Sequence, residues 1–154
     1  GDALYRRSVY SFWKRTAPPP SMAAFNAPTR EQCTVRRERT NTPIQALVLM
    51  NDPQFVESAR RLAENAIRQE ADDQIRAEWM LSAVLSRPAQ AVDVADITAA
   101  ASELKTMFQQ KPEAAKELIS TGDTKPDETL DAAELAAWTL VANTLMNRDD
   151  FVSK

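Results

Sequence analysis

Two helix starts lie back to back in the segment Thr42–Val56, which reads TPIQALVLMNDPQFV. Thr42 is a favoured helix cap, a proline suited to the first turn follows it, and Gln45 stands where it completes a capping box. Asp52, with a proline directly after it, repeats the device. The segment therefore predicts one helix that begins after Thr42 and a second that begins after Asp52.

Helical patterns continue on the C-terminal side of this segment. Apolar residues recur three and four positions apart in three stretches, at 55–66, 75–85 and 94–108. The second stretch, whose helix Asp72 and Asp73 open, is heavily apolar and predicts the central helix of the core. The narrow stripe of the third predicts an outer helix. A short helix near Glu113–Ser120, a polar loop at 121–130 and a last helix capped by Asp131, with Glu134 closing its capping box, complete this half.

The N-terminal side combines one helical pattern with a run of prolines. The spacing of apolar residues in Leu4–Arg15 predicts a short amphipathic helix, which must end before Pro18-Pro19-Pro20. These prolines predict an irregular, extended arm over residues 17–41. We expect Met22 and Phe25 to hold that arm against the core.

Composition agrees with a helical fold. Only two glycines occur, and alanine is plentiful beside leucine, glutamate, arginine and glutamine, which favours helices and disfavours β-hairpins. We expect an all-α fold, a compact irregular helical bundle of about five to six helices with an extended proline-rich N-terminal arm. A single domain would span residues 1–154, with an N-terminal helix at 1–16, the arm at 17–41 and the helical core at 42–154.

The absence of histidine excludes several kinds of catalytic centre from this chain. Ser-His-Asp and Cys-His catalysis, zinc sites that need imidazole and histidine-ligated haem all require that side chain. Neither glycine lies between a strand pattern and a helix pattern, so no phosphate-binding loop is predicted. No apolar run approaches the roughly 20 residues of a membrane span. We predict no catalytic residue, no metal, no cofactor and no membrane span in this chain.

Charge is unevenly distributed. Residues 1–40 contain eight Lys and Arg against three Asp and Glu, a net charge of +5, and the remainder contains eleven against nineteen, a net charge of −8. The chain as a whole lacks the basic balance of a nucleic-acid binder, so we predict no nucleic-acid partner. The asymmetry instead favours docking of the basic segment on its own acidic partner domain.

Three arginines stand shortly before the first helix start: Arg36, Arg37 and Arg39. Their guanidinium forks and the backbone N–H groups after Thr42 together predict a site for an anion, such as phosphate, sulfate or carboxylate, or for a partner. The alternative is that the arginines pair with acidic residues such as Glu57 and Glu64 and fix the arm.

Three further features each have two interpretations. The segment 123–134 has carboxylates at four ligand positions of an EF-hand calcium loop, but Lys125 and Glu128 stand where an oxygen ligand and a glycine belong. Cys33 lies among arginines that would favour its thiolate, so it is either a reactive thiol or a buried structural cysteine. The tryptophans, which either pack in the core or line a sugar-binding surface, are Trp13, Trp79 and Trp138.

Longer motifs carry a resemblance to a known family. They are Leu4–Arg15, Pro18–Met22, Cys33–Leu47, Asn51–Val56 and Leu135–Asn143. With these motifs the chain resembles a planctomycete-specific domain of unknown function, which forms the C-terminal region of large bacterial proteins. Many of those proteins carry a planctomycete cytochrome-c domain near the N-terminus. The resemblance covers essentially the whole chain.

The resemblance implies a setting but no activity. Proteins of this kind look exported, to the periplasm or the cell surface, and any haem would be bound by an upstream domain. This chain would be the C-terminal portion of its domain. The family has no agreed active site, so no catalytic residue can be carried over, and Asn26 stands where the family often has an aspartate.

Our leading hypothesis is a non-catalytic helical interaction or structural module of a larger exported bacterial protein. It would pack on the upstream domains of the same polypeptide or on a protein partner, through the arginine-rich arm. One alternative is an accessory or binding part of a polysaccharide-processing enzyme, which would bind an anionic polysaccharide. The other is a redox protein linked to the cytochrome-c domain.

Overall fold

The computed structural model describes residues 7–14 and 16–152. Within these residues the fold is all-α and has no β-strand, which confirms the predicted fold class. Six of the helices have seven or more residues. A short 3₁₀ turn at Ser8–Tyr10 precedes the α-helices, which are α1 (Pro20–Ala24), α2 (Pro43–Asn51), α3 (Pro53–Gln69), α4 (Asp73–Leu85), α5 (Ala91–Gln110), α6 (Pro112–Ile119), α7 (Ala132–Met146) and α8 (Asp149–Val152).

The predicted helix caps are present. The Thr42 hydroxyl accepts a hydrogen bond from the backbone N–H of Gln45, and the Gln45 side chain accepts one from the backbone N–H of Thr42. Asp52 and Asp72 cap α3 and α4 in the same position. Asp131 caps α7 through the backbone N–H of residue 134 at 2.8 Å. Local capping chemistry thus places the start of each of these four helices.

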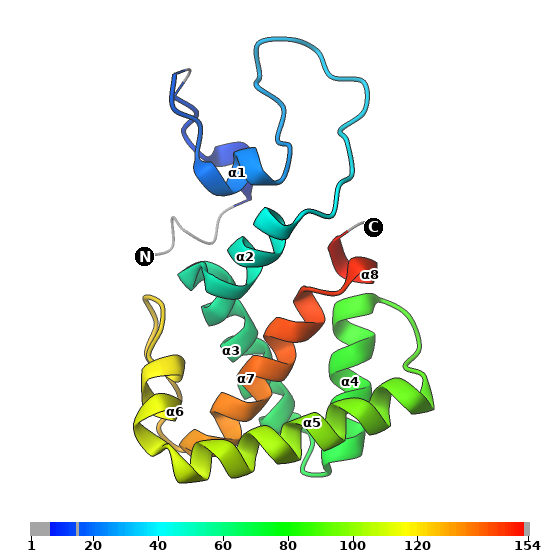
Figure 1. Ribbon diagram of the computed structural model, residues 1–154, viewed down its shortest axis with the longest axis vertical. Coiled ribbons are helices and arrows are strands. Elements are labelled where there is room, and N and C mark those ends of the chain that lie inside the picture. Colours follow the sequence, from blue (N-terminus) through cyan, green and yellow to red (C-terminus); the bar gives the residue numbers. More distant parts are fainter. Residues whose placement is uncertain (1–6, 15, 153–154) are drawn as a thin grey trace.

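The core is organised around α7. This helix packs against α3, α5 and α6 and is buried along most of its length, with Leu135, Trp138, Val141 and Leu145 almost inaccessible to water. Figure 1 shows α7 running between α3 and α4, with α5 crossing beneath their lower ends. Alanines fill much of the remaining surface of α7, so neighbouring helices approach it from several sides.

The prediction that the segment after Asp73 forms the central helix is wrong, because α7 holds that place. Ile75 of α4 is 51% exposed, and Trp79 packs against the core with only part of its surface. The outer position predicted for the next helix is confirmed. In α5 only Ala101 and Phe108 are buried, and the helix lies across the outside of the bundle.

The predicted amphipathic helix at Leu4–Arg15 is not formed in the residues that can be compared. Positions 4–6 and 15 lie outside the described residues, and residues 7–14 contain only the 3₁₀ turn Ser8–Tyr10. Val9, Tyr10 and Phe12 are exposed, so the apolar face that a helix would present has no surface to cover. A helix this short is not stable without such packing.

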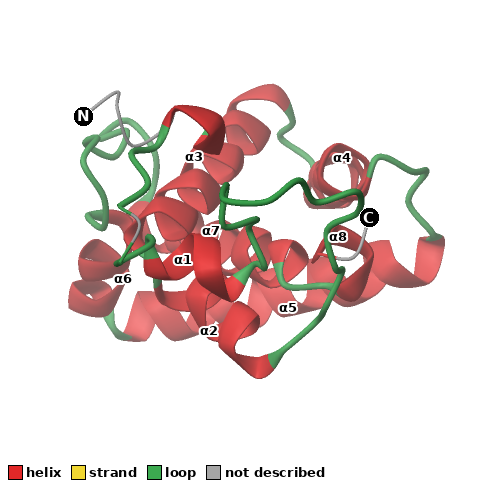
Figure 2. Ribbon diagram, turned by 90° about the horizontal axis from the view of Figure 1, so that it is seen from above, coloured by secondary structure: helices red, strands yellow, loops and turns green. Residues whose placement is uncertain are grey.

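The arm lies at one end of the molecule, on the side of α2 that faces away from α5 and α6 (Figure 1). Seen from above, the loop that leads from α1 to α2 crosses in front of the helical bundle (Figure 2). It is less irregular than predicted, because Pro20 takes the first position of the short helix α1. Phe25 holds the arm to the core as expected, with its ring centroid 6.2 Å from that of Phe55 at the start of α3.

No helix in the described part of the chain combines the length and the apolar character that a membrane crossing needs.

Candidate functional site

The three arginines predicted as a binding cluster lie around one hollow. Arg36, Arg37 and Arg39 line a cavity of about 370 Å³ together with Phe25, Glu38, Thr40, Gln45 and Val152. We call this cavity the arginine hollow. It brings the arm, the first turn of α2 and the last residue of α8 together, although these segments are far apart in the sequence.

Within the arginine hollow the three arginines differ in what they contact. Arg37 donates a hydrogen bond through Nη2 to the backbone carbonyl of Phe25. Arg39 already has an interaction elsewhere in the chain. Arg36 is exposed, and within residues 7–14 and 16–152 its side chain makes no ion pair. The positive charge that faces the hollow therefore comes chiefly from Arg36 and Arg37.

Thr42 does not take part in the arginine hollow. Its hydroxyl and its backbone N–H are both used in the capping box with Gln45, at 3.3 Å and 2.9 Å. Thr42 is not among the residues that line the cavity. The structure thus brings together the three arginines of the predicted site and leaves the helix cap beside them as a structural element.

The alternative pairing of these arginines with Glu57 and Glu64 is wrong. Both glutamates lie on α3 and are buried around Arg60, whose side chain is 0% exposed. Arg60 Nη1 lies 2.7 Å from Glu64 Oε1, and Arg60 Nη2 lies 3.6 Å from Glu57 Oε1. The ion pairs of these glutamates within residues 7–14 and 16–152 are thus made with arginines of their own helix.

The same buried charges bind the loop 121–130. Arg60 donates to the backbone carbonyls of Thr124 at 2.7 Å and Lys125 at 3.2 Å, and Glu57 accepts from the backbone N–H of Asp123 at 2.7 Å and of Thr124 at 3.0 Å. Sequence reasoning missed this network. A signal was present in α3, where a glutamate stands three residues before Arg60 and another four residues after it, which is the spacing of helical ion pairs.

The carboxylates of the calcium interpretation have other tasks. Asp127 accepts hydrogen bonds from the hydroxyl and the backbone N–H of Thr129 and from Arg68. Asp131 caps α7, and the Glu134 carboxylate pairs with Arg76 at 2.8 Å instead of closing the capping box. Within residues 7–14 and 16–152 there is no group of three or more metal-binding side chains.

Two surface carboxyl groups have shifted pKa values. The hydroxyl and backbone N–H of Thr129, followed by the guanidinium of Arg68, lower the pKa of Asp127 to about 2. A hydrogen bond from Arg87 lowers the pKa of Asp150 on α8. Both shifts stabilise the charged form of a residue that holds a loop or a terminal helix in place, and neither carboxyl group lies in the arginine hollow.

Cys33 is exposed, so the interpretation as a buried structural cysteine is wrong. It borders a shallow hollow on the outside of the arm, which Arg36 and Arg37 also line.

Of the three tryptophans one is buried and two are partly exposed. Trp138 is buried in α7 with the guanidinium carbon of Arg76 at 5.0 Å from its ring centroid, and Trp79 packs against the core. Trp13 on the arm has Arg30 at 5.4 Å over its ring. Arg30 also donates to the backbone carbonyls of residues 8 and 11, at 3.0 Å and 3.2 Å, and so holds the first segment of the arm together.

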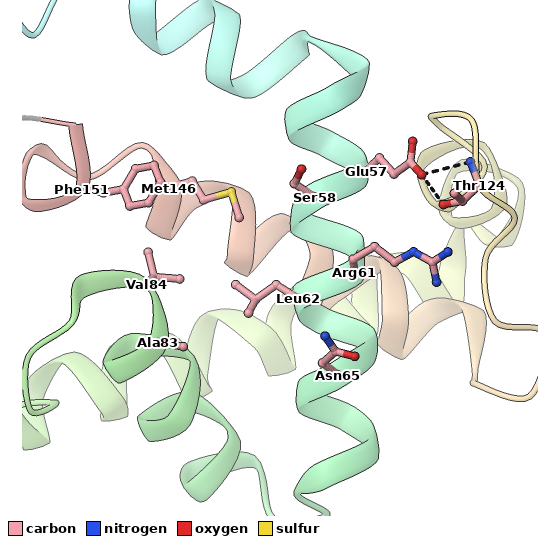
Figure 3. Close-up of a pocket in the computed structure, with 10 residues that line it drawn as sticks. All are labelled: Glu57, Ser58, Arg61, Leu62, Asn65, Ala83, Val84, Thr124, Met146 and Phe151. Carbon is pink, nitrogen blue, oxygen red and sulfur yellow. Dashed lines mark hydrogen bonds between the residues drawn. The ribbon is translucent and has the colours of Figure 1, made fainter. Parts of the chain in front are cut away.

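A second cavity, of about 550 Å³, lies between α3, α4 and the C-terminal helices. Figure 3 shows Leu62, Val84 and Phe151 facing one another across it, whereas the charged ends of Glu57 and Arg61 point to the opposite side of α3. Ser58 donates its hydroxyl to a backbone carbonyl of its own helix at 2.7 Å. No group of polar side chains converges on this apolar cleft, so the arginine hollow remains the candidate site.

Fold and site together define an all-helical module that carries an arginine-lined hollow where its arm meets the core. One family profile matches residues 1–101, which span the arm, α2, α3, α4 and half of α5. The chain belongs to this family, PSD1, which is described as a protein of unknown function (DUF1553). No curated protein and no solved structure matches the chain.

Proposed function

We propose that this chain is a non-catalytic interaction module that docks on another protein surface through its arm and α2. The distribution of exposed apolar side chains carries the proposal. Among the described residues ten large apolar side chains are exposed, and seven of them lie in the N-terminal third of the chain. They are Val9, Tyr10, Phe12, Val35, Ile44, Leu47 and Met50. Clusters of this kind are typical of interaction sites, whereas isolated exposed apolar residues are not.

Helix α2 contributes the most regular part of this surface. Only Gln45 and Leu49 are buried in it, while Ile44, Leu47 and Met50 are 64%, 59% and 56% exposed. Covering such side chains removes apolar surface from water, which is worth about 1 kcal/mol or more for each of them. A partner that covers the outer side of α2 would therefore gain affinity from residues that add nothing to the stability of the isolated chain.

Charge supports a partner that is acidic. The N-terminal segment carries a net charge of +5, and Arg36 and Arg37 have no carboxylate partner within the described residues. The carboxylates of Glu57 and Glu64 are used by Arg60. We therefore infer a partner surface with carboxylates beside apolar side chains. The first candidate is the upstream part of the same polypeptide, in the exported multidomain protein that the family resemblance implies.

An anionic polysaccharide is the second candidate ligand, since it too would be attracted by the arginines. Aromatic rings that bind sugars need an open face, and Arg30 lies over the ring of Trp13. The geometry therefore favours a protein partner. Titration with sulfated and neutral polysaccharides separates the two candidates. If the ligand is a polysaccharide, the sulfated chain should bind saturably and with the full affinity of the site, and if the partner is a protein it should not.

The proposed function is tested by calorimetric titration of this chain with the separately produced upstream part of its parent polypeptide. We expect saturable binding that weakens at least about tenfold in the variant Ile44→Ser with Leu47→Ser and in the variant Arg36→Ala with Arg37→Ala. Val92→Ser is the matched control, because Val92 is 71% exposed on α5, away from the arm. If the α2 variant binds as tightly as the control, the proposed docking surface is wrong.

A further inference from the structure

The arginine hollow contains an excess of hydrogen-bond donors. Its lining includes three arginines and one carboxylate, Glu38, which leaves a net charge of +2. Arg37 uses one of the five N–H groups of its guanidinium on the carbonyl of Phe25. Arg36 uses none of its own on a described residue, so the guanidinium donors outnumber the acceptors.

The polar residues at the base of the hollow add a donor and no acceptor. Gln45 is 2% exposed and its amide is fully used, since Oε1 accepts from the backbone N–H of Thr42 and Nε2 donates to Ala24 O and to Thr40 Oγ1, each at 2.9 Å. Thr40 Oγ1 also accepts from Asn26 Nδ2 at 2.7 Å. With both lone pairs occupied, the Thr40 hydroxyl has its hydrogen left to donate.

The size and walls of the hollow select among anions. A volume of about 370 Å³ exceeds what a single small ion fills, and Phe25 and Val152 add apolar surface to the wall. A carboxylate on an aliphatic stem matches both features, because the planar carboxylate fits a guanidinium fork and the stem contacts the apolar wall. The two aspartates of α8 already have partners, since Asp149 accepts from Asn41 at 3.0 Å and Asp150 pairs with Arg87 at 2.9 Å.

We propose that the arginine hollow binds glutamate or aspartate side chains of an acidic protein segment, with Arg36 and Arg37 as the residues that hold the carboxylates. This assignment rests on the proposed function and names the part of the partner that the hollow receives. Thr40 donates a further hydrogen bond, and Gln45 keeps Thr40 in position. Because the arginines attract the carboxylates electrostatically, the affinity should fall as the salt concentration rises.

The test uses a short polyglutamate peptide with blocked ends, titrated into the chain at low ionic strength and again at about 0.15 M. A polyglutamine peptide of the same length is the neutral probe, and sulfated polysaccharide and sodium sulfate are the competing anions. We expect saturable binding of polyglutamate and no binding of polyglutamine. Arg36→Gln with Arg37→Gln should weaken polyglutamate binding at least about tenfold.

A matched control removes the same net charge elsewhere. Arg61→Gln with Lys116→Gln changes two largely exposed cations outside the hollow and should leave the affinity within about twofold of the unchanged chain. Because Arg37 also supports the arm through Phe25, the single variant Arg36→Gln is measured as well. It should lose affinity with no change in the unfolding midpoint, since Arg36 contacts no described residue through an ion pair.

Three results would overturn the assignment. One is equal binding by the hollow variant and the charge-matched control, which would show a general attraction to the chain. The others are an Arg36-dependent affinity for sulfated polysaccharide above that for polyglutamate, and full displacement of polyglutamate by sulfate at equal charge concentration. These three results concern binding of the peptide and say nothing about association with the upstream polypeptide. A wrong assignment of the arginine hollow can therefore be told apart from a wrong docking surface. Loss of that association with polyglutamate binding retained would instead contradict only the docking surface.

Discussion

Replacing the buried Arg60 by methionine tests the charge network that joins α3 to the loop 121–130. Arg60 is 0% exposed and stands between the carboxylates of Glu57 and Glu64, which are themselves almost inaccessible to water. The variant Arg60→Met keeps an unbranched side chain but removes the buried cation that lies between two buried carboxylates, and of these Glu64 keeps the half-exposed Arg61 at 2.8 Å. The variant also removes the donors that reach the backbone carbonyls of Thr124 and Lys125.

The expected loss of stability is large. Removing one partner of a buried ion pair costs about 3–5 kcal/mol, because the remaining charge stays buried without compensation. We expect a loss of about 4 kcal/mol for Arg60→Met, which is a large share of the 5–15 kcal/mol that is usual for a domain. With a urea slope of roughly 2 kcal/mol per molar, the unfolding midpoint should fall by about 2 M.

The assay is urea unfolding followed by tryptophan fluorescence and far-UV circular dichroism. Arg61→Met is the matched control on the same helix. Its guanidinium lies 2.8 Å from the same Glu64 carboxylate, but its side chain is 49% exposed, so the change should cost less than about 1 kcal/mol. Adding Glu64→Gln to Arg60→Met should restore part of the lost stability, because it removes a buried charge whose ion-pair partner in the single variant is the half-exposed Arg61.

Two results would refute the reasoning. If Arg60→Met and Arg61→Met lowered the stability equally, burial would not determine the cost of losing an arginine at this cluster. If Glu64→Gln added to Arg60→Met lowered the stability further, the buried charge of Glu64 would not be a source of the loss in the single variant. A variant too unstable for a urea curve is compared by limited proteolysis, in which the loop 121–130 should be cut faster than in the Arg61→Met chain.

Three further changes test single contacts. Gly122→Ala should cost about 3 kcal/mol in urea unfolding, because Gly122 has a φ of +106° and an added Cβ would lie 2.6 Å and 2.7 Å from side-chain carbons of Glu57. Thr42→Ala should cost about 1 kcal/mol through loss of the α2 cap, measured in the same way. Asp127→Asn should remove an acid-sensitive contribution to the unfolding midpoint. Since Thr129 and an arginine lower the pKa of Asp127 to about 2, that contribution is complete above the unfolded pKa near 3.8 and is lost as the pH falls toward 2.

Two of these changes, Gly122→Ala and Asp127→Asn, have a control in the same region. Lys125→Ala alters an exposed loop side chain and should change stability by less than about 0.5 kcal/mol, so an equally small effect of Gly122→Ala would contradict the close approach to Glu57. Glu128→Ala controls for the loss of one loop carboxylate. If Glu128→Ala reduces the fall of the unfolding midpoint between pH 4 and pH 2 as much as Asp127→Asn does, the hydrogen bonds from Thr129 to Asp127 are not the cause of the acid sensitivity.

The parts of the fold that sequence reasoning predicted correctly depend on contacts within a few residues. The caps Thr42, Asp52, Asp72 and Asp131 accept hydrogen bonds from N–H groups two or three positions further on, so their signal is complete in the local sequence. The same holds for the outer helix α5, whose apolar stripe is narrow enough to show that it packs on one side only. Local patterns therefore predicted where the core helices begin and how polar each one is.

The errors arise where the outcome depends on which distant surfaces meet. The apolar face of residues 4–15 predicts a helix only if some surface covers it, and Val9 and Phe12 are exposed in the folded chain. The length and apolar content of the 75–85 stretch suggested a central helix. The centre is instead α7, because its small side chains let several neighbours approach closely, a property that periodicity does not measure.

The candidate site was predicted in its residues but not in its surroundings. Arg36, Arg37 and Arg39 were singled out by their density in the sequence, and they line one hollow. Gln45, Thr40 and Val152 could not be assigned to it from the sequence, because the fold alone brings the first turn of α2 and the end of α8 to the arm. Gln45 was recognised for its role in the capping box, and the structure adds that its amide also positions Thr40.

The buried arginines explain why the positive charge of the arm remains available. Arg60 pairs with Glu57 and Glu64 of its own helix, and Arg76 pairs with Asp73 of its own helix and with Glu134 of α7. These four carboxylates of the core thus form ion pairs with arginines of the core. A net charge of −8 in residues 41–154 is therefore not a measure of free carboxylates, and among the described residues Arg36 and Arg37 form no ion pair with the acidic part of the chain. These two arginines line a hollow with few acceptors among the described residues, and the proposed protein partner would supply the carboxylates that match them.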